Sequence, residues 1–373
     1  MDFLLQGIQA ITWQQVVMWV IGGVLIWLAI AKDYEPTLLL PMGFGAILVN
    51  IPLSGAIGEH GIVQWLFNIG IEASEAMPLI LFIGIGAMID FGPLLSNPKM
   101  FLFGAGAQFG IFVTIIGATL LGFNLIDAAS IGIIGAADGP TAIFVSQKFG
   151  SAYMGPISVA AYSYMALVPI ILPFAIKLVT TKKERQIRMD YKPATVSRRT
   201  RILFPIIVTV VAGLVAPDSV SLVGFLMFGN LIRECGRLDR LSLTAQNELA
   251  NLVTILLGIT IAFSMRAEQF VNFDTIRIML LGLVAFIFDA VGGVLLAKLI
   301  NVFMPKGKKI NPMIGAAGIS AFPMASRVVH KMGIKEDNQN FLLMHAAGAN
   351  VAGQIASVIA GGMILGLVPR MLG

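Results

Sequence analysis

The stretch Gly135-Ala-Ala-Asp-Gly-Pro-Thr-Ala142 decides the fold, and it lies within an apolar run from Asp127 to Ser146. Pro140 has no backbone N–H and disfavours helix at Gly139, so the run should break beside Asp138 and free backbone carbonyls there. An ionisable side chain inside a bilayer costs about 2.5–3.5 kcal/mol on insertion scales and marks a functional site by default. The stretch therefore predicts a membrane helix that is broken around one carboxylate.

Composition supports a membrane protein. Of 373 residues, 57% are hydrophobic and 12% are charged, whereas a soluble domain carries roughly 25% charged residues. The chain has 40 Gly and 17 Pro, residues that membrane helices carry more often than soluble ones. The single cysteine, Cys235, excludes an intrachain disulfide. Nucleotide-binding Gly-rich loops ending in GK[ST], HExxH motifs and zinc-spaced Cys/His clusters are absent from the sequence.

About 20 apolar residues cross the hydrocarbon core as a helix. The sequence predicts an all-α polytopic membrane protein of about ten to twelve helical elements in a single transmembrane domain over residues 1–373. The candidate segments are Val16–Ala31, Thr37–Ile51, Ala76–Leu94, Met100–Leu121, Asp127–Ser146, Ile157–Val179, Ile202–Val215, Val220–Ile232, Leu249–Met265, Ile276–Val302, Pro312–Val329 and Leu342–Leu367. The first of these is expected to be a retained span, because no cleavable signal peptide precedes it.

One long polar stretch, Thr181–Arg201, interrupts the apolar segments near the middle of the chain. Its basic residues are Lys182, Lys183, Arg185, Arg188, Lys192, Arg198, Arg199 and Arg201, against two acidic residues. The positive-inside rule places this stretch in the cytoplasm. The chain's net charge of +5 therefore indicates membrane orientation, and no nucleic-acid partner is expected. The stretch lies where a linker between two transporter repeats would lie.

Residues 135–150 match residues 318–333 without a gap, with six of sixteen positions identical. The abundance of Gly and Ala explains part of this match, whereas the shared proline, Pro140 and Pro323, and the Lys-x-Gly ending favour a true repeat. We predict two repeats of inverted topology, at about 35–180 and about 202–373, each with a Gly/Pro-broken helix. Such paired breaks indicate a binding site near the bilayer midplane.

Asp138 is the strongest candidate residue, because a carboxylate beside freed carbonyls and the Thr141 hydroxyl can hold a monovalent cation with oxygen ligands alone. Its alternative role is to cap the half-helix that follows. Asp289 lies equally deep but lacks a neighbouring Pro or hydroxyl, and a functional and a structural role remain equally open. Asp90, near a segment end, is expected to serve as a cap or loop residue.

The second broken segment carries neutral oxygen groups instead of a carboxylate. Asn311-Pro312 opens it, Gly315 allows close backbone approach, and Ser320 lies three residues before Pro323. Arg327 follows, and a buried guanidinium requires an anionic partner. That partner is either a substrate carboxylate or one of the aspartates Asp138 and Asp289.

Two other segments place polar groups in apolar helices. Tyr162 and Tyr164 lie on different faces of one helix and need hydrogen-bond partners, in a site or as packing contacts. In the last segment, Asn350, Gln354 and Ser357 follow helical spacing and form one polar stripe. His345, in the same segment, is expected to be a packing residue.

Four ordered motifs carry a resemblance over nearly the whole chain. They are Gly135–Thr141, Ala161-Tyr-Ser-Tyr-Met165, the segment from Asn311-Pro-Met-Ile-Gly315 through Ser320 to Arg327, and Met344-His-Ala-Ala-Gly-Ala-Asn350-Val-Ala-Gly. Together they resemble the β subunit of sodium-translocating biotin-dependent decarboxylases, the family of the oxaloacetate, methylmalonyl-CoA and glutaconyl-CoA sodium pumps.

The resemblance implies a membrane subunit that decarboxylates carboxybiotin and couples CO2 release to Na+ export with proton consumption. It implies that Asp138 binds sodium and couples transport to decarboxylation, that Tyr164, Asn311, Gly315, Ser320 and Asn350 take part in sodium binding or coupling, and that Arg327 acts on carboxybiotin. Tyr162 belongs to the same motif. The cofactors are then Na+ and biotin, the latter on a partner because an Ala-Met-Lys-Met biotinylation motif is absent from this sequence.

The implied partners are a biotin carrier protein or domain, a carboxyltransferase α subunit, a small membrane γ-type subunit, membrane lipid and further copies of this chain. The implied location is the cytoplasmic (inner) membrane of a bacterium or archaeon. A competing hypothesis is a secondary sodium-coupled carboxylate transporter with inverted repeats, in which Arg327 would clamp the solute. The sequence leaves open which acid is decarboxylated and how many Na+ ions move.

Overall fold

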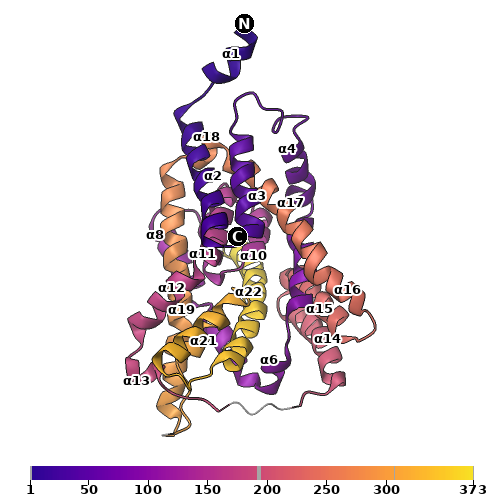
Figure 1. Cartoon of the computed structure of the whole chain (residues 1–373). Coiled ribbons are helices and arrows are strands. Elements are labelled where there is room, and N and C mark those ends of the chain that lie inside the picture. Colours follow the sequence, from indigo (N-terminus) through magenta and orange to yellow (C-terminus); the bar gives the residue numbers. More distant parts are fainter. Residues whose placement is uncertain (1, 191–194, 306, 373) are drawn as a thin grey trace.

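A computed structural model describes residues 2–190, 195–305 and 307–372 (Figure 1). All regular elements among these residues are helices, which confirms the all-α prediction. In the view of Figure 1, α1, α4 and α18 lie towards one end of the bundle, and α13, α21 and α6 lie towards the other. Residues 191–194 of the basic linker, including Lys192, lie outside the described residues.

Over residues 2–190, the first described range, the chain forms thirteen α-helices and three short helices of other types. They are α1 (Asp2–Gln9), α2 (Trp13–Lys32), α3 (Pro36–Val49), α4 (Ile62–Phe67), η1 (Asn68–Glu72), α5 (Ala76–Met88), α6 (Gly92–Ser96), η2 (Pro98–Met100), α7 (Phe101–Gly106), α8 (Phe109–Leu120), α9 (Leu125–Gly132), η3 (Ile133–Ala136), α10 (Gly139–Lys148), α11 (Met154–Ala166), α12 (Val168–Val179) and α13 (Lys182–Arg185).

The second half is also helical throughout its described part. Its elements are α14 (Arg198–Val215), η4 (Pro217–Ser219), α15 (Val220–Glu234), α16 (Asp239–Thr244), η5 (Ala245–Leu249), α17 (Ala250–Ile261), η6 (Ala262–Met265), α18 (Ala267–Phe270), α19 (Phe273–Phe303), α20 (Met313–Ala316), α21 (Met324–Glu336) and α22 (Leu343–Leu372).

Within the part of the chain that the structure describes, five stretches are long and apolar enough to cross a membrane, and two further bent helix pairs raise the number to seven. All twelve predicted segments contain helix, but the prediction missed α4 and η1, which join α5 in a pair bent by 66°. The predicted segment Ile157–Val179 is not one straight helix, because α11 and α12 meet at 78°. Pro169, in the first turn of α12, cannot donate a backbone hydrogen bond into α11, and the helix turns there.

Two long helices, α19 and α22, organise the site region. With 31 residues, α19 is about 46 Å long, enough to span a hydrocarbon core of about 30 Å. It packs against α8, α11, α12 and α20, and α22 runs through the centre of the bundle (Figure 1). At the contact between α19 and α20, a Cβ on Gly315 would overlap the Gly293 carbonyl, so only glycine lets the two backbones approach this closely.

The described start of the basic linker packs against the segment around α21. Arg185 forms an ion pair with Glu336 at 2.7 Å, and Arg188 forms one with Asp337 at 2.5 Å. The Asn311 amide donates to the carbonyls of Arg185 and Ile187, at 2.8 Å each. The linker is therefore docked onto the second half of the chain. That the halves are inverted repeats remains a prediction.

Candidate functional site

Asp138 sits at a helix break that its neighbours create. The chain leaves α9 through the 3-10 turn η3, passes Ala137 in the left-handed region at φ 54°, and reaches Asp138 in extended conformation. Helix α10 then begins at Gly139-Pro140, where proline costs no hydrogen bond because N-terminal N–H groups lack helical partners. The Thr141 N–H donates to Asp138 Oδ1 at 3.4 Å. The predicted break is confirmed, and Asp138 does cap the half-helix.

The second carboxylate oxygen of Asp138 is where three side chains converge. Oδ2 accepts hydrogen bonds from Ser320 Oγ at 3.1 Å, Gln354 Nε2 at 3.1 Å and Ser357 Oγ at 2.9 Å. Asp138 is only 3% exposed. Capping needs one oxygen, so the convergence on the other oxygen is a separate feature of this site. Gln354 and Ser357 come from the polar stripe predicted on α22.

Ser320 reaches Asp138 because the second segment is broken at the matching place. The chain between α20 and α21 is not α-helical, and the Ser320 N–H donates to the Ala136 carbonyl of η3 at 3.0 Å. The Asn350 amide donates to the Ile319 carbonyl at 2.7 Å. The two breaks and α22 thus meet at one point. The internal match pointed to the two breaks, whereas the sequence did not show where the polar stripe of α22 lies.

The chemistry of this cluster suits a hard monovalent cation. It offers one carboxylate and several neutral oxygens, and the buried Thr141 Oγ1 and Asn350 Oδ1 lack hydrogen-bond partners among the described residues. A hydroxyl that donates to the carboxylate can turn its lone pairs towards a bound ion. The described residues hold no group of three or more His, Cys, Asp or Glu side chains suited to a metal. The cluster is thus unlike a zinc or calcium site.

Other candidate residues lie outside hydrogen-bond contact with Asp138. The Tyr164 hydroxyl donates to the Met279 carbonyl of α19, Asn311 holds the linker, and Gly315 packs against α19. The buried Tyr162 ring packs over Gly139, and its hydroxyl lacks a partner among the described residues. The two tyrosines do face different neighbours, as their spacing predicts. Roles of these residues in sodium binding or coupling remain predictions.

The other two acidic candidates differ in environment. Asp289 is fully buried in α19, and its Oδ1 accepts from the Ile111 N–H at 3.1 Å. Asp90 accepts from the Gly92 N–H at 2.8 Å just before α6 and lies 3.8 Å from Arg201. The loop role expected for Asp90 is confirmed.

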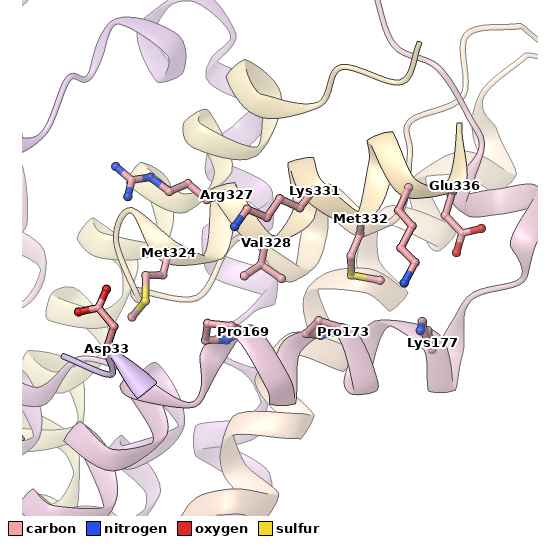
Figure 2. A pocket seen from close by; sticks show the side chains of 11 residues that line it. Asp33, Pro169, Pro173, Lys177, Met324, Arg327, Val328, Lys331, Met332 and Glu336 are labelled. Atoms are coloured by element: carbon pink, nitrogen blue, oxygen red, sulfur yellow. The ribbon is translucent and has the colours of Figure 1, made fainter. Parts of the chain in front are cut away.

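Arg327 lies in an open cleft of about 540 Å³ between α12 and α21 (Figure 2). The expectation of a buried guanidinium is wrong, because Arg327 is exposed and forms no ion pair within the described part of the chain. The break before α21 starts that helix only three residues before Arg327, and this places the side chain at the cleft instead of in the core. Neither Asp138 nor Asp289 is its partner.

The cleft combines apolar walls with positive charge. Pro169, Pro173, Met324, Val328 and Met332 supply the apolar lining, and Lys177, Lys331 and Lys335 supply further cations. Figure 2 shows Arg327 and Asp33 at one end of the cleft and Lys177 and Glu336 at the other. Sequence reasoning missed this row, although the four-residue spacing of Arg327, Lys331 and Lys335 on one helix signals a shared face.

The ion pair between Arg188 and Asp337 sets the charge state of both groups at the linker contact. The pKa of the Asp337 carboxyl is lowered by its hydrogen bond with Arg188, and the pKa of the Arg188 guanidinium is raised by the same contact. Both groups are therefore charged at neutral pH. Glu336, although it lines the cleft, is paired with Arg185, so Asp33 is the one lining acid whose charge no ion pair offsets among the described residues.

Comparison with known proteins identifies the family of the chain. Residues 14–368 match the family described as the Na+-transporting oxaloacetate decarboxylase beta subunit. The chain is 49% identical to the glutaconyl-CoA decarboxylase subunit beta of Acidaminococcus fermentans, covering 97% of this chain and 95% of that protein. It is 47% identical to the methylmalonyl-CoA decarboxylase subunit beta of Propionigenium modestum, covering 97% and 96%. It is 45% identical to the oxaloacetate decarboxylase beta chain of Klebsiella pneumoniae, covering 96% of each. The chain belongs to the family of beta subunits of Na+-transporting decarboxylases.

Proposed function

We propose that this chain is the membrane subunit of a primary sodium pump that decarboxylates carboxybiotin, exports Na+ and consumes a proton. The observation that carries the proposal is the convergence of Ser320, Gln354 and Ser357 on one oxygen of the buried Asp138. No basic side chain forms an ion pair with Asp138 among the described residues. Its charge is thus free to be neutralised by a transported ion.

Asp138 is the proposed sodium ligand and coupling residue. A carboxylate removed from water favours a neutralised state, which either Na+ or a proton can supply. Ser320 and Asn350 add oxygens to the site, and Thr141 supports it from α10. Tyr164, Tyr162, Asn311 and Gly315 act around this site, through the packing of α11, α19 and the linker. Alternation between Na+ and a proton at Asp138 then exchanges one cation for the other across the membrane.

The cleft at Arg327 is the proposed site for the carboxylated cofactor, which a partner subunit carries. The residues fit such a group, because the cleft pairs apolar walls with an unpaired guanidinium suited to a carboxylate. When bound, carboxybiotin supplies a carboxyl group whose loss as CO2 releases free energy. Arg327 holds and orients that carboxyl group, and Met324, Val328 and Met332 exclude water from one side of it.

Coupling runs along one short segment. Ser320 touches Asp138, and Arg327 follows seven residues later at the start of α21. Loss of the carboxylate charge bound at Arg327 would shift α21. Such a shift would alter the contacts of Ser320 at the proposed sodium site. Moving one charge against 100 mV costs about 2.3 kcal/mol, so export requires an exergonic step, and the sequence has no nucleotide-binding loop to supply one.

The remaining assignments follow the family. We assign the chain to a complex with a biotin carrier protein or domain, a carboxyltransferase α subunit and a small membrane γ-type subunit, with more than one copy of this chain. The complex is placed in the bacterial or archaeal cytoplasmic membrane with the linker in the cytoplasm. The three relatives named above are subunits of decarboxylases for different acids, so the choice of acid is assigned to the carboxyltransferase. A secondary carboxylate carrier is not favoured, because the relatives are decarboxylase subunits.

The decisive experiment uses the intact complex in proteoliposomes, with CO2 release and 22Na+ uptake measured in NaCl and in KCl. We expect Na+-dependent CO2 release and transport, both lost in Asp138→Asn. Asp90→Asn, an identical change in the loop before α6, is the matched control and should retain both. Full Na+-dependent decarboxylation in Asp138→Asn would refute the proposed site. Sodium-driven carboxylate uptake without CO2 release would instead establish a carrier.

A further inference from the structure

Asp289 occupies a position that the proposed transport scheme does not use. It lies in the middle of α19 with none of its surface exposed. The stretch Pro98–Leu120 opposite it is interrupted between α7 and α8, at Ala107 and Gln108. The first N–H groups of a helix lack intrahelical partners, and the side chain of Gln108 provides no cap for α8. The Ile111 N–H reaches only the nearby Gln108 carbonyl on its own segment, at 3.3 Å, and it also donates to Asp289 Oδ1 at 3.1 Å. Asp289 therefore adds a cap to the start of α8 from another helix.

The other oxygen of Asp289 faces the turn that leads to Asp138. A Cβ on Gly135 would lie 2.6 Å from Asp289 Oδ2, so the carboxylate rests against a glycine whose missing side chain makes room for it. Asp289 Oδ2 has no hydrogen-bond partner among the described residues. Gly135 belongs to η3, and the next residue, Ala136, accepts the Ser320 N–H at 3.0 Å.

These contacts connect α8, α19 and η3 beside the proposed sodium site. The Asp289 side chain touches the start of α8 on one side and η3 on the other, and η3 leads into Asp138 and carries the contact to Ser320. We propose that Asp289 is a positioning residue for the Asp138 site, which fixes η3 against α8 and α19 so that Asp138 and Ser320 keep their alignment. This inference rests on the proposed sodium role of Asp138.

The positioning role requires shape and a hydrogen-bond acceptor and does not require a charge. Asparagine keeps both, because its Oδ1 can accept the Ile111 N–H in the same place. Alanine keeps neither. A substitution at Gly135 acts from the opposite side, because a methyl group there would displace the carboxylate or the turn. The two positions should therefore be energetically coupled.

The test measures the half-saturating Na+ concentration and the maximal rate of decarboxylation by the intact complex. Asp289→Ala should raise the half-saturating concentration about 10-fold with a maximal rate within about 3-fold of wild type, and Asp289→Asn should restore both. Gly135→Ala should also raise the half-saturating Na+ concentration. In the double variant the increase should be clearly smaller than the product of the single increases, because removal of the carboxylate makes room for the methyl group.

Asn230→Ala is the matched control, since Asn230 is also fully buried and donates to the Ile89 carbonyl at the end of α5, away from Asp138. It should lower thermal stability and leave the Na+ requirement unchanged.

An unaltered Na+ requirement in Asp289→Ala and Gly135→Ala would overturn the inference. Loss of activity at all Na+ concentrations in Asp289→Asn would also overturn it, by showing that Asp289 must ionise. If Asp289→Ala does not assemble, Asp289→Asn and Gly135→Ala decide alone. Absence of Na+ dependence in the wild type would instead refute the proposed function.

Discussion

Ser320 Oγ lies 3.1 Å from Asp138 Oδ2, although 182 residues separate them along the chain. The contact joins the two helix breaks, and each break brings its residue to the interior through a different backbone device. Asp138 follows a left-handed residue and precedes the Gly139-Pro140 pair, whereas the Ser320 N–H donates to the Ala136 carbonyl. The proposed sodium site therefore lies between the halves of the chain and belongs to neither alone.

Ser320→Ala should weaken sodium binding. It removes one hydrogen bond to a charged group, worth about 1.5–3 kcal/mol, so the half-saturating Na+ concentration should rise about 10-fold or more. The measurement is CO2 release by the reconstituted complex over a NaCl series. Ser130→Ala removes a buried hydroxyl that donates only to its own helix, at the Ile126 carbonyl. A Na+ requirement raised equally by both variants would contradict a specific role of Ser320.

Arg327→Ala should raise the KM for the carboxylated carrier about 10-fold to 100-fold, because it removes a charged hydrogen-bond donor to a carboxylate. Arg327→Lys should recover only part of this loss, since a lysine cannot form the two-point contact. Steady-state kinetics with purified carrier measures both. Arg240→Ala, on the exposed helix α16 away from the cleft, is the control. A KM unaffected in Arg327→Ala would place the carboxylate elsewhere.

Lys331 and Lys335 at the cleft should control the association rate of the carboxylated carrier. Lys331→Gln and Lys335→Gln remove positive charge at the mouth of the cleft, and rim charges act mainly on association rates. We expect kcat/KM for the carrier to fall about 3-fold to 10-fold at low ionic strength, with kcat unchanged and a weaker dependence on salt. Lys99→Gln, outside the cleft, should behave as wild type. An undiminished salt dependence in the double variant would show that the row does not face the partner.

The pair Arg188–Asp337 should stabilise the docked linker in a pH-dependent manner. The pKa of Asp337 is lowered in the folded protein by Arg188. Its contribution to stability is therefore complete above the unfolded pKa of about 3.9 and is lost as the pH falls through the lowered folded value. Asp337→Asn should lower the Tm at neutral pH, and its difference from wild type should close below about pH 4. Thermal unfolding in detergent over a pH series measures this. A difference that persists in acid would mean that the charge of Asp337 is not responsible.

Much of this organisation could be predicted from local sequence. Apolar length located the helices, and the Gly139-Pro140 pair located the break at Asp138, because both depend on neighbours along the chain. The stripe of Asn350, Gln354 and Ser357 followed from helical spacing, but its target did not. Only tertiary structure shows that it meets Asp138.

The sequence left some features of the structure unpredicted, for separate reasons. The segment α4–η1 was missed because Gln64, Asn68 and Glu72 interrupt its apolar pattern. Arg327 was expected in the interior because its neighbours are apolar, whereas the start of α21 places it at the cleft. The cap that Asp289 provides for α8 could not be inferred, since it joins residues 178 positions apart. Contacts between distant helices carry no local signature.

The docking of the linker limits how α21 can move. Ser320 ties the segment before α21 to η3, and Glu336 and Asp337 tie its other end to Arg185 and Arg188. The helix of 13 residues is about 20 Å long, and sliding along its axis would break contacts at one end or the other. Rotation about that axis would leave the two ends of the helix in place. We therefore expect a movement at Arg327 to reach the contact between Ser320 and Asp138 as a rotation of α21, and not as a shift along its axis.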